Sequence, residues 1–281
     1  METIKNIKTA KERAMYGTKD KELVNCRFEG IEDGESALKE SNNVIVRDTY
    51  FDLRYPFWHC INAICENIEM TEKCRAAFWY TKNISIENSI LNGTKVLREC
   101  RVIRLVNTEI SSQELGWFCN NLVIQNVKTK GEYSFFKSEK MIVNNLYLTG
   151  KYSFQYVKNV EIKNSVLDTK DAFWESENVT VIDSVIKGEY LGWYAKNLKL
   201  VRCKIIGTQP LCYCENLILE DCKMIDTDLA FEYSSVNATI INEVDSIKNP
   251  ISGKIVCKKI KELIFDENRR DNNSVIIEET N

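Results

Sequence analysis

The sequence predicts an all-β fold, a single-stranded right-handed parallel β-helix of roughly 12 coils. The first observation is a period: an asparagine position recurs every 19 residues from Asn83 to Asn216, with Val102 and Lys140 replacing it twice. The second is that the first and third residues after it are aliphatic, as in Val160 and Ile162. The third is that all five tryptophans share one phase of the repeat. Such a strict period indicates one supersecondary unit stacked on copies of itself.

Each unit is expected to hold three short strands and three corners. The alternating aliphatic pair predicts a half-buried first strand. Five residues after the starting asparagine comes another Asn or Asp, as in Asn164 and Asp183, with Arg202 as the exception. Because Asn tolerates left-handed backbone and can bond to its copy on the next coil, this position predicts an asparagine ladder at a corner. A small residue and an aliphatic then indicate a second strand, and the aromatic residues a third.

The apolar spacing of two excludes helical repeats. Left-handed hexapeptide coils need multiples of six residues and pentapeptide coils multiples of five; 19 is neither, which favours the right-handed form.

Residues 1–19 are expected to be an N-terminal cap with a short helix in 9–17, because Thr9 and Glu12 resemble a capping box. Residues 20–256 form the β-helix. Residues 257–281 are expected to be two C-terminal capping strands around a polar turn, which gives one domain overall.

Composition limits the functional classes. The net charge is −3, with 38 basic and 41 acidic residues, which argues against a nucleic-acid partner. No apolar run suits a signal peptide or a membrane span, so we expect a cytoplasmic protein without a membrane partner. The eleven cysteines are odd in number and fall mainly at small core positions of the repeat, which favours packing in a reducing compartment over disulfides.

A family resemblance supports this fold. The segments "GTQPLCYCENLILEDCKM" (207–224), "AFEYSSV" (230–236) and "SIKNPISGKI" (246–255) resemble an uncharacterised bacterial family, a domain of unknown function in the pectin-lyase-like β-helix superfamily. The resemblance covers nearly the whole chain. It implies the fold and no established activity, because members of this superfamily include lyases and glycosidases as well as binding and structural proteins.

The direction of the side chains in the third strand decides which surface is available. One residue after the tryptophan phase comes a mixed column whose charges are expensive to bury, so it should face water. This column comprises His59, Tyr80, Glu99, Phe118, Lys137, Tyr156, Glu175, Tyr194, Tyr213 and Glu232. Strand alternation then turns the tryptophans inward and the preceding residues outward, namely Phe57, Phe78, Leu97, Phe135, Phe154 and Phe173. Arg98 and Gln155 interrupt the tryptophan column and leave the opposite parity open.

Under either parity an aromatic column faces outward, and such a stripe usually marks something bound or covered. The predicted ligand-binding residues are Phe57, His59, Phe78, Tyr80, Phe135, Phe154, Tyr156, Phe173, Tyr194 and Tyr213. We expect the stripe either to bind a glycan or a protein partner, or to be covered by a terminal segment, a loop such as 29–42 or a second copy of the chain.

No catalytic constellation is evident, and the candidate catalytic residues are Glu175, Glu99, Glu232 and His59. Glycoside hydrolysis needs two carboxyl groups about 5–10 Å apart. Glu175 and Glu232 would be roughly 14 Å apart, and Glu175 and Glu177 about 7 Å. However, Glu177 belongs to an alternating series, Glu139, Lys158, Glu177, Lys196 and Glu215, which predicts an ion-pair ladder between coils.

Neither a metal nor a cofactor is expected, because the lone pair Cys212 and Cys214 lacks the spacing of a zinc site.

Three functions remain open. The first is a non-catalytic binding or scaffold protein that presents the aromatic face to a glycan or protein. The second is a carbohydrate-active enzyme, a glycosidase or polysaccharide-lyase-like protein. The third is a homo-oligomer whose aromatic face is only an interface.

Overall fold

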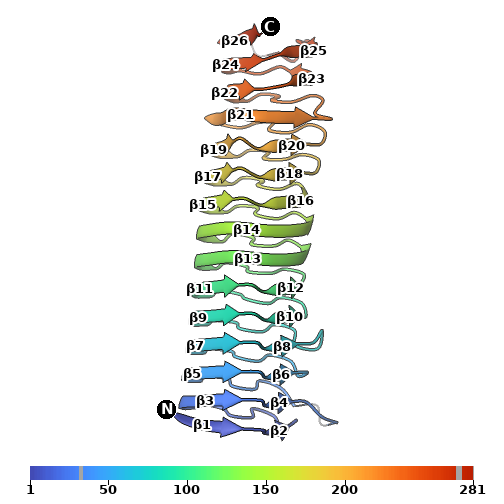
Figure 1. Ribbon diagram of the computed structural model, residues 1–281. Helices are drawn as coiled ribbons and strands as arrows, with labels where there is room; N and C mark the ends of the chain where they lie inside the picture. The colour runs from blue at the N-terminus through green and yellow to red at the C-terminus, as the bar shows by residue number, and fades with distance from the viewer. Residues whose placement is uncertain (32–33, 270–273, 281) are drawn as a thin grey trace. The chain divides into compact units, whose positions relative to one another are not determined.

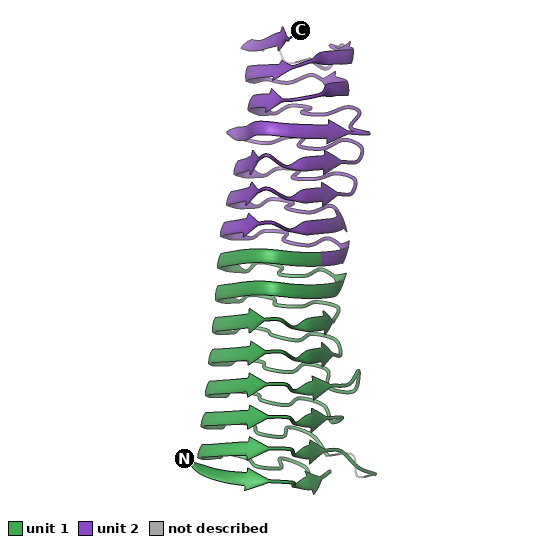
Figure 2. Cartoon of the chain, viewed as in Figure 1, with its two compact units in different colours: residues 1–147 green, residues 148–281 purple. Residues whose placement is uncertain are grey.

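The computed structural model describes residues 1–31, 34–269 and 274–280. These residues contain 26 β-strands and no helix (Figure 1). The chain divides into two compact units, residues 1–147 and 148–281 (Figure 2). Each unit is a parallel β-solenoid, and together they comprise about 14 turns. The predicted parallel β-helix is therefore confirmed, with about two more turns than expected, because the terminal segments also form coils.

In unit 1 each coil has a longer first strand and a shorter second strand. The first strands are β1 (Glu2–Lys5), β3 (Lys19–Val24), β5 (Asn42–Arg47), β7 (Ile61–Glu66), β9 (Lys82–Glu87), β11 (Arg101–Val106) and the long β13 (Asn120–Glu132). The second strands are β2 (Lys8–Thr9), β4 (Arg27–Phe28), β6 (Tyr50–Phe51), β8 (Glu69–Met70), β10 (Ile90–Asn92) and β12 (Glu109–Ser111). Strand β14 (Glu139–Lys151) contains the residues at which the two units divide.

Unit 2 repeats this plan. Its first strands are β15 (Lys158–Lys163), β17 (Glu177–Ile182), β19 (Lys196–Val201), the long β21 (Leu217–Ile225), β22 (Ser235–Ile240), β24 (Ser252–Cys257) and β26 (Ser274–Glu279). Its second strands are β16 (Val166–Lys170), β18 (Val185–Lys187), β20 (Lys204–Ile206), β23 (Glu243–Lys248) and β25 (Lys259–Ile264).

Coils stack in parallel register, so that equivalent residues become neighbours. Strand β17 pairs with β15 and with β19, which places Val179 beside Val160 and beside Leu198. Val179 is fully buried, as the alternating pattern predicts for a residue that points into the coil. The aliphatic periodicity of the sequence is therefore the core of the solenoid.

The predicted asparagine ladder is present at the corner after the first strand. The side-chain amide of Asn107 donates to Asn88 at 3.1 Å, and that of Asn126 donates to Asn107 at 3.0 Å. These residues have φ values of 49–53°, in the left-handed region that Asn tolerates. Arg202 has the same conformation (φ 49°). Its guanidinium replaces the ladder by donating to both carboxylate oxygens of Asp183, at 2.6 and 2.8 Å.

A second asparagine ladder, which was not predicted, lies at the start of the first strands, where Val102 and Lys140 interrupt it. The amide of Asn178 donates to Asn159 at 3.1 Å, that of Asn197 to Asn178 at 2.8 Å, and that of Asn216 to Asn197 at 3.1 Å. The asparagines that mark the 19-residue period are therefore hydrogen-bonded to one another along unit 2.

The third side of the coil, which precedes each first strand, is not the strand that we expected. In the described residues it consists of turns with isolated parallel bridges, such as that between Trp79 and Arg98. Every second residue has positive φ, as in Tyr152 (60°), Phe154 (58°) and Tyr156 (57°). Because left-handed residues interrupt the extended backbone, side chains no longer alternate between two faces. Along four consecutive residues the order is instead buried, half-buried, exposed and buried. In residues 173–176, for example, Trp174 is half-buried, Glu175 is exposed and Ser176 is buried.

The N-terminal helix is also absent from the structure. Strand β2 ends at Thr9, and the segment predicted to be helical contains turns in which Arg13 and Met15 have φ of 50° and 59°. Strand β1 pairs in parallel with β3, so residues 1–19 build a coil of their own. The capping-box motif misled because Thr9 ends a strand; its hydroxyl accepts from the amide of Lys11 at 3.2 Å.

At the other end the two expected strands exist as β25 and β26. They continue the parallel stacking, because β25 pairs with β23 and β26 with β24. Part of the polar turn predicted between them, residues 270–273, lies outside the described residues. In the described part of the chain, no helix is long and apolar enough to cross a membrane.

All eleven cysteines are buried and free, which confirms that they pack in the core. Burial raises the pKa of Cys60, Cys74 and Cys212 to about 12. Since the thiolate is the reactive form, we expect the folded protein to release no more than about one equivalent of thionitrobenzoate from DTNB at pH 8 within minutes. All eleven thiols should react in denaturant. Fast reaction of several thiols without denaturant would contradict this burial.

Candidate functional site

The structure separates the predicted aromatic surface into a buried and an exposed column. Phe57, Phe78, Phe135, Phe154 and Phe173 are fully buried. Their predicted outward position, and with it their role in binding a surface ligand, is therefore wrong. The left-handed backbone of the third side turns the residue before the tryptophan phase into the core. Leu97 is fully buried in the same way.

The column after the tryptophan phase faces solvent, as predicted. His59, Tyr80, Glu99 and Phe118 are exposed in unit 1, as are Glu175 and Tyr194 in unit 2, where Tyr156, Tyr213 and Glu232 are half-buried. His59 stacks on Tyr80 with ring centroids 4.9 Å apart. Among the described residues, His59 contacts the rings of Trp58 and Tyr80 and has no hydrogen bond or ion pair with the acidic partner that a catalytic histidine needs.

The half-buried tryptophans form hydrogen bonds between neighbouring coils. The indole N–H of Trp79 donates to the backbone carbonyl of Lys95 at 2.6 Å, and that of Trp193 donates to Gln209 at 2.8 Å. The amide of Gln155 makes the equivalent bond to Asp171 at 3.3 Å. Gln155 therefore interrupts the tryptophan column but makes the same hydrogen bond to the next coil as the tryptophans do.

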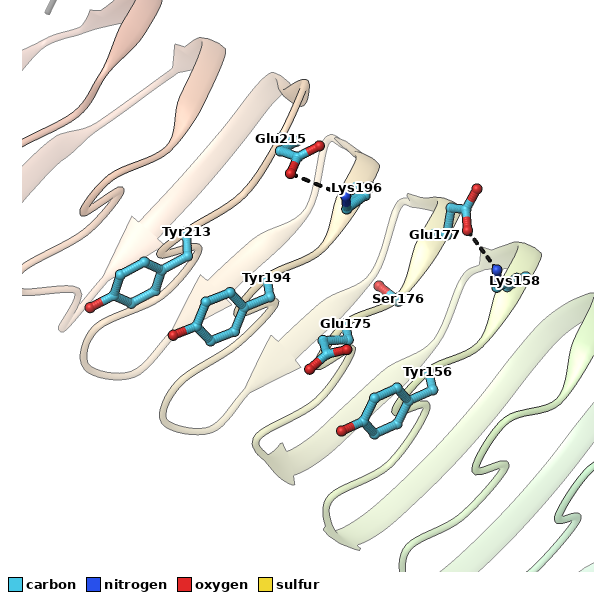
Figure 3. A pocket seen from close by; sticks show the side chains of 9 residues that line it. All are labelled: Tyr156, Lys158, Glu175, Ser176, Glu177, Tyr194, Lys196, Tyr213 and Glu215. Carbon is cyan, nitrogen blue, oxygen red and sulfur yellow. Dashed lines mark ion pairs between the residues drawn. The ribbon is translucent and has the colours of Figure 1, made fainter.

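A shallow groove of about 460 Å³ lies on the third side of unit 2 (Figure 3). Its lining residues are Tyr156, Lys158, Glu175, Ser176, Glu177, Tyr194, Lys196, Tyr213 and Glu215. Figure 3 shows two rows of side chains that point in opposite directions. The ring row consists of Tyr156, Glu175, Tyr194 and Tyr213, and the charge row of Lys158, Glu177, Lys196 and Glu215.

The charge row is the predicted ion-pair ladder. Lys158 lies 2.8 Å from Glu177, and Lys196 lies 3.1 Å from Glu215. The hydrogen bond from Lys158 lowers the pKa of Glu177, whereas a general acid at neutral pH needs a raised pKa. In Figure 3 the carboxylates of Glu175 and Glu177 also point to opposite sides of the groove. The two residues therefore do not form the acid pair considered from the sequence.

The ring row is held by contacts among its rings and with the tryptophans behind it. Tyr194 and Tyr213 stack with centroids 4.7 Å apart and planes inclined by 13°. Trp174 lies 5.6 Å from Tyr194, and Trp193 lies 5.4 Å from Tyr213. Burial raises the pKa of Tyr213. The phenol groups of all three tyrosines point the same way, away from the coils (Figure 3).

Glu175 occupies one position of the ring row. Its backbone N–H donates to the carbonyl of Trp193 at 2.9 Å. Within the described residues, its carboxylate has neither a hydrogen bond nor an ion pair. The other acidic candidates differ, because Glu232 pairs with Lys248 at 2.9 Å and Glu99 lies 3.9 Å from Arg98.

Unit 1 has a second groove, of about 450 Å³, that the sequence did not indicate. Tyr55, Trp58, Arg75, Trp79 and Lys95 are among its lining residues. Trp58 and Trp79 stack almost parallel, with centroids 5.2 Å apart, and Arg75 donates to the hydroxyl of Tyr55 at 2.7 Å. The shared tryptophan phase was a usable signal, but the Tyr55–Arg75 contact joins positions that no period relates. Among the described residues, no group of three or more His, Cys, Asp or Glu side chains could hold a metal ion.

Comparison with known proteins identifies a family and distant structural neighbours. The surface adhesin PfbA of Streptococcus pneumoniae is 11% identical over 96% of this chain and 80% of that one, with a TM-score of 0.42. The A-module of the Azotobacter vinelandii mannuronan C-5 epimerase AlgE4 is 10% identical over 85% and 90%, with a TM-score of 0.38.

The catalytic domain of a GH87 α-1,3-glucanase is 12% identical over 98% of this chain and 63% of that one, with a TM-score of 0.38. Likeness this distant carries no argument about activity. Curated proteins give no match. A family described as "Protein of unknown function (DUF3737)" matches residues 2–278.

Proposed function

The chain belongs to the DUF3737 family of unknown function, and from the groove of unit 2 we propose that it binds a linear glycan without catalysing a reaction on it. The observation that carries the proposal is the ring row, in which Tyr156, Tyr194 and Tyr213 direct their hydroxyls outward beside an open groove. Tyrosine suits this role because one side chain supplies both an apolar ring and a hydrogen-bonding hydroxyl.

The repeat favours an extended ligand. Neighbouring coils lie about 4.8 Å apart, so the ring row offers similar groups at a regular interval along the groove. A polymer of similar sugar units can meet such a row with one unit after another. The charge row on the other side adds donors and acceptors whose charges already neutralise one another.

Binding is favoured over hydrolysis because the groove lacks a second suitable carboxyl group. Glu175 is the carboxylate of the ring row, and Glu177 is held in its ionised form by Lys158. A glycosidase needs one carboxylic acid that keeps its proton and a second carboxylate across the bond. Among the described residues of this groove, Glu175 and Glu177 point to opposite sides and so do not flank one glycosidic bond.

We expect titration calorimetry with linear oligosaccharides to detect binding that the double variant Tyr194→Ala/Tyr213→Ala weakens by about tenfold or more, since a truncated tyrosine at a contact costs about 1–2 kcal/mol. The matched control is Tyr147→Ala, which removes a tyrosine that is 47% exposed and lies outside the groove.

The proposal fails if no oligosaccharide binds, or if the double variant and the control bind equally well. Light scattering on the same sample tests the remaining alternative. A stable dimer that the double variant dissociates would mean that the ring row is an interface between copies of the chain.

A further inference from the structure

We propose that the groove of unit 2 selects a glycan with free amino groups, and that a sugar ammonium group sits against Glu175 between Tyr156 and Tyr194. This inference rests on the proposed glycan-binding function and names the class of glycan. It follows from an open position in the ring row, from the unpaired carboxylate there, and from the equivalent carboxylate of unit 1, which has a cation of the chain beside it.

The ring row has an open position at Glu175 because this side chain is shorter than the tyrosines before and after it in the row. Tyr156, Glu175 and Tyr194 are spaced by one repeat each and lie on three successive coils. At about 4.8 Å a coil, the two tyrosine rings lie about 10 Å apart. By contrast, Tyr194 and Tyr213 lie on neighbouring coils, with only 4.7 Å between their centroids, which leaves no room for a ligand group.

A cation fits this interval. A group midway between the rings would lie about 5 Å from each centroid, within the roughly 6 Å range of a cation–π interaction. The carboxylate of Glu175 would accept a charge-assisted hydrogen bond from the same group. Lys158 and Lys196 do not compete for it, because each is paired with a glutamate of the charge row.

In unit 1 a cation of the chain lies beside the equivalent carboxylate. Four repeats earlier in the sequence, Tyr80, Glu99 and Phe118 occupy the phases of Tyr156, Glu175 and Tyr194. There the guanidinium of Arg98 lies in the tryptophan column, 5.1 and 5.3 Å from the ring centroids of Trp79 and Trp117. It is also 3.9 Å from the carboxylate of Glu99 and 5.5 Å from the ring centroid of Phe118. In unit 2 the phase of Arg98 is taken by the neutral Trp174, whose ring packs against Trp193 and Tyr194. Among the described residues no cation of the chain pairs with Glu175, so its carboxylate remains available to a ligand.

The test compares three hexasaccharides that share a β-1,4 linkage and differ at carbon 2, built from glucosamine, N-acetylglucosamine and glucose. We expect calorimetry to show that the glucosamine hexamer binds about tenfold more tightly than the other two. Glu175→Gln should remove this preference, so that the variant binds the three hexamers with affinities within about twofold of one another. The control Glu99→Gln should keep the preference, because its carboxylate already lies beside Arg98.

A second variant recreates the arrangement of unit 1. In Trp174→Arg, an internal guanidinium would pair with the carboxylate of Glu175 as Arg98 does with Glu99, so the preference for glucosamine should disappear while Glu175 is retained. A thermal unfolding curve shows whether the loss of the Trp174–Trp193 contact has unfolded the protein, in which case Glu175→Gln alone decides.

The outcomes separate the two proposals. Equal binding of the three hexamers overturns the amino-sugar inference and leaves glycan binding standing, whereas no binding of any hexamer overturns both. A preference that survives in Glu175→Gln overturns the proposed site. Pentalysine distinguishes the source of the ammonium group, because equal affinity for it and for the glucosamine hexamer would overturn the assignment to an amino sugar.

Discussion

Replacing Phe173 by alanine is expected to lower the free energy of unfolding by about 3–5 kcal/mol. Phe173 is fully buried and stacks on Phe154, with centroids 5.3 Å apart and planes inclined by 19°. The surrounding backbone is held by bonds between coils, including one from the Phe173 amide to the carbonyl of Ser153 at 3.1 Å. The cavity can therefore collapse only partly, which is the condition under which such truncations cost most.

Urea denaturation followed by circular dichroism measures this loss. Phe173→Leu keeps most of the volume and should cost about 1 kcal/mol. Tyr194→Ala, which removes an exposed ring stacked on one neighbour, should also cost about 1 kcal/mol. Equal losses for Phe173→Ala and Tyr194→Ala would mean that the buried and exposed columns are assigned incorrectly.

The second large effect is expected for Gly188→Ala, which should destabilise the protein by about 2–6 kcal/mol, as the sum of backbone strain and overpacking. Gly188 has a φ of 149°, and an added Cβ would lie 2.4 Å from the carbonyl oxygen of Thr169 on the neighbouring coil. Because the obstacle is backbone, no side-chain rotation relieves the clash. Gly207 has the same relation to the carbonyl oxygen of Gly188, also at 2.4 Å.

Gly17→Ala is the matched control, since Gly17 has a φ of 62° and nothing within 4 Å of an added Cβ. It should cost about 1 kcal/mol, the conformational part alone. The same urea titration compares the two variants. A loss for Gly188→Ala no larger than for Gly17→Ala would show that the coils can separate at this corner without cost.

The candidate site was predicted only in part. The outward column with Tyr156, Glu175 and Tyr194, and the ion-pair ladder that forms the charge row, both followed from residue type and period. The phenylalanine column was assigned to the wrong side, because alternation applies to extended strands and the third side is not one. The sequence did not predict that the carboxylate of Glu175 is unpaired. Its unpaired state depends on the neighbouring lysines, which form ion pairs with Glu177 and Glu215 instead.

The repeat by itself determined the stacked parallel coils, their aliphatic interior and the asparagine corner, because parallel register brings each residue beside its own copy and hydrophobicity then sorts inside from outside. The sign of φ along the third side was decided only by the tertiary structure. Phe154, Tyr156 and Glu175 adopt left-handed backbone that their residue types do not favour. Hydrogen bonds to the neighbouring coils offset that cost, and these bonds exist only once the coils have stacked.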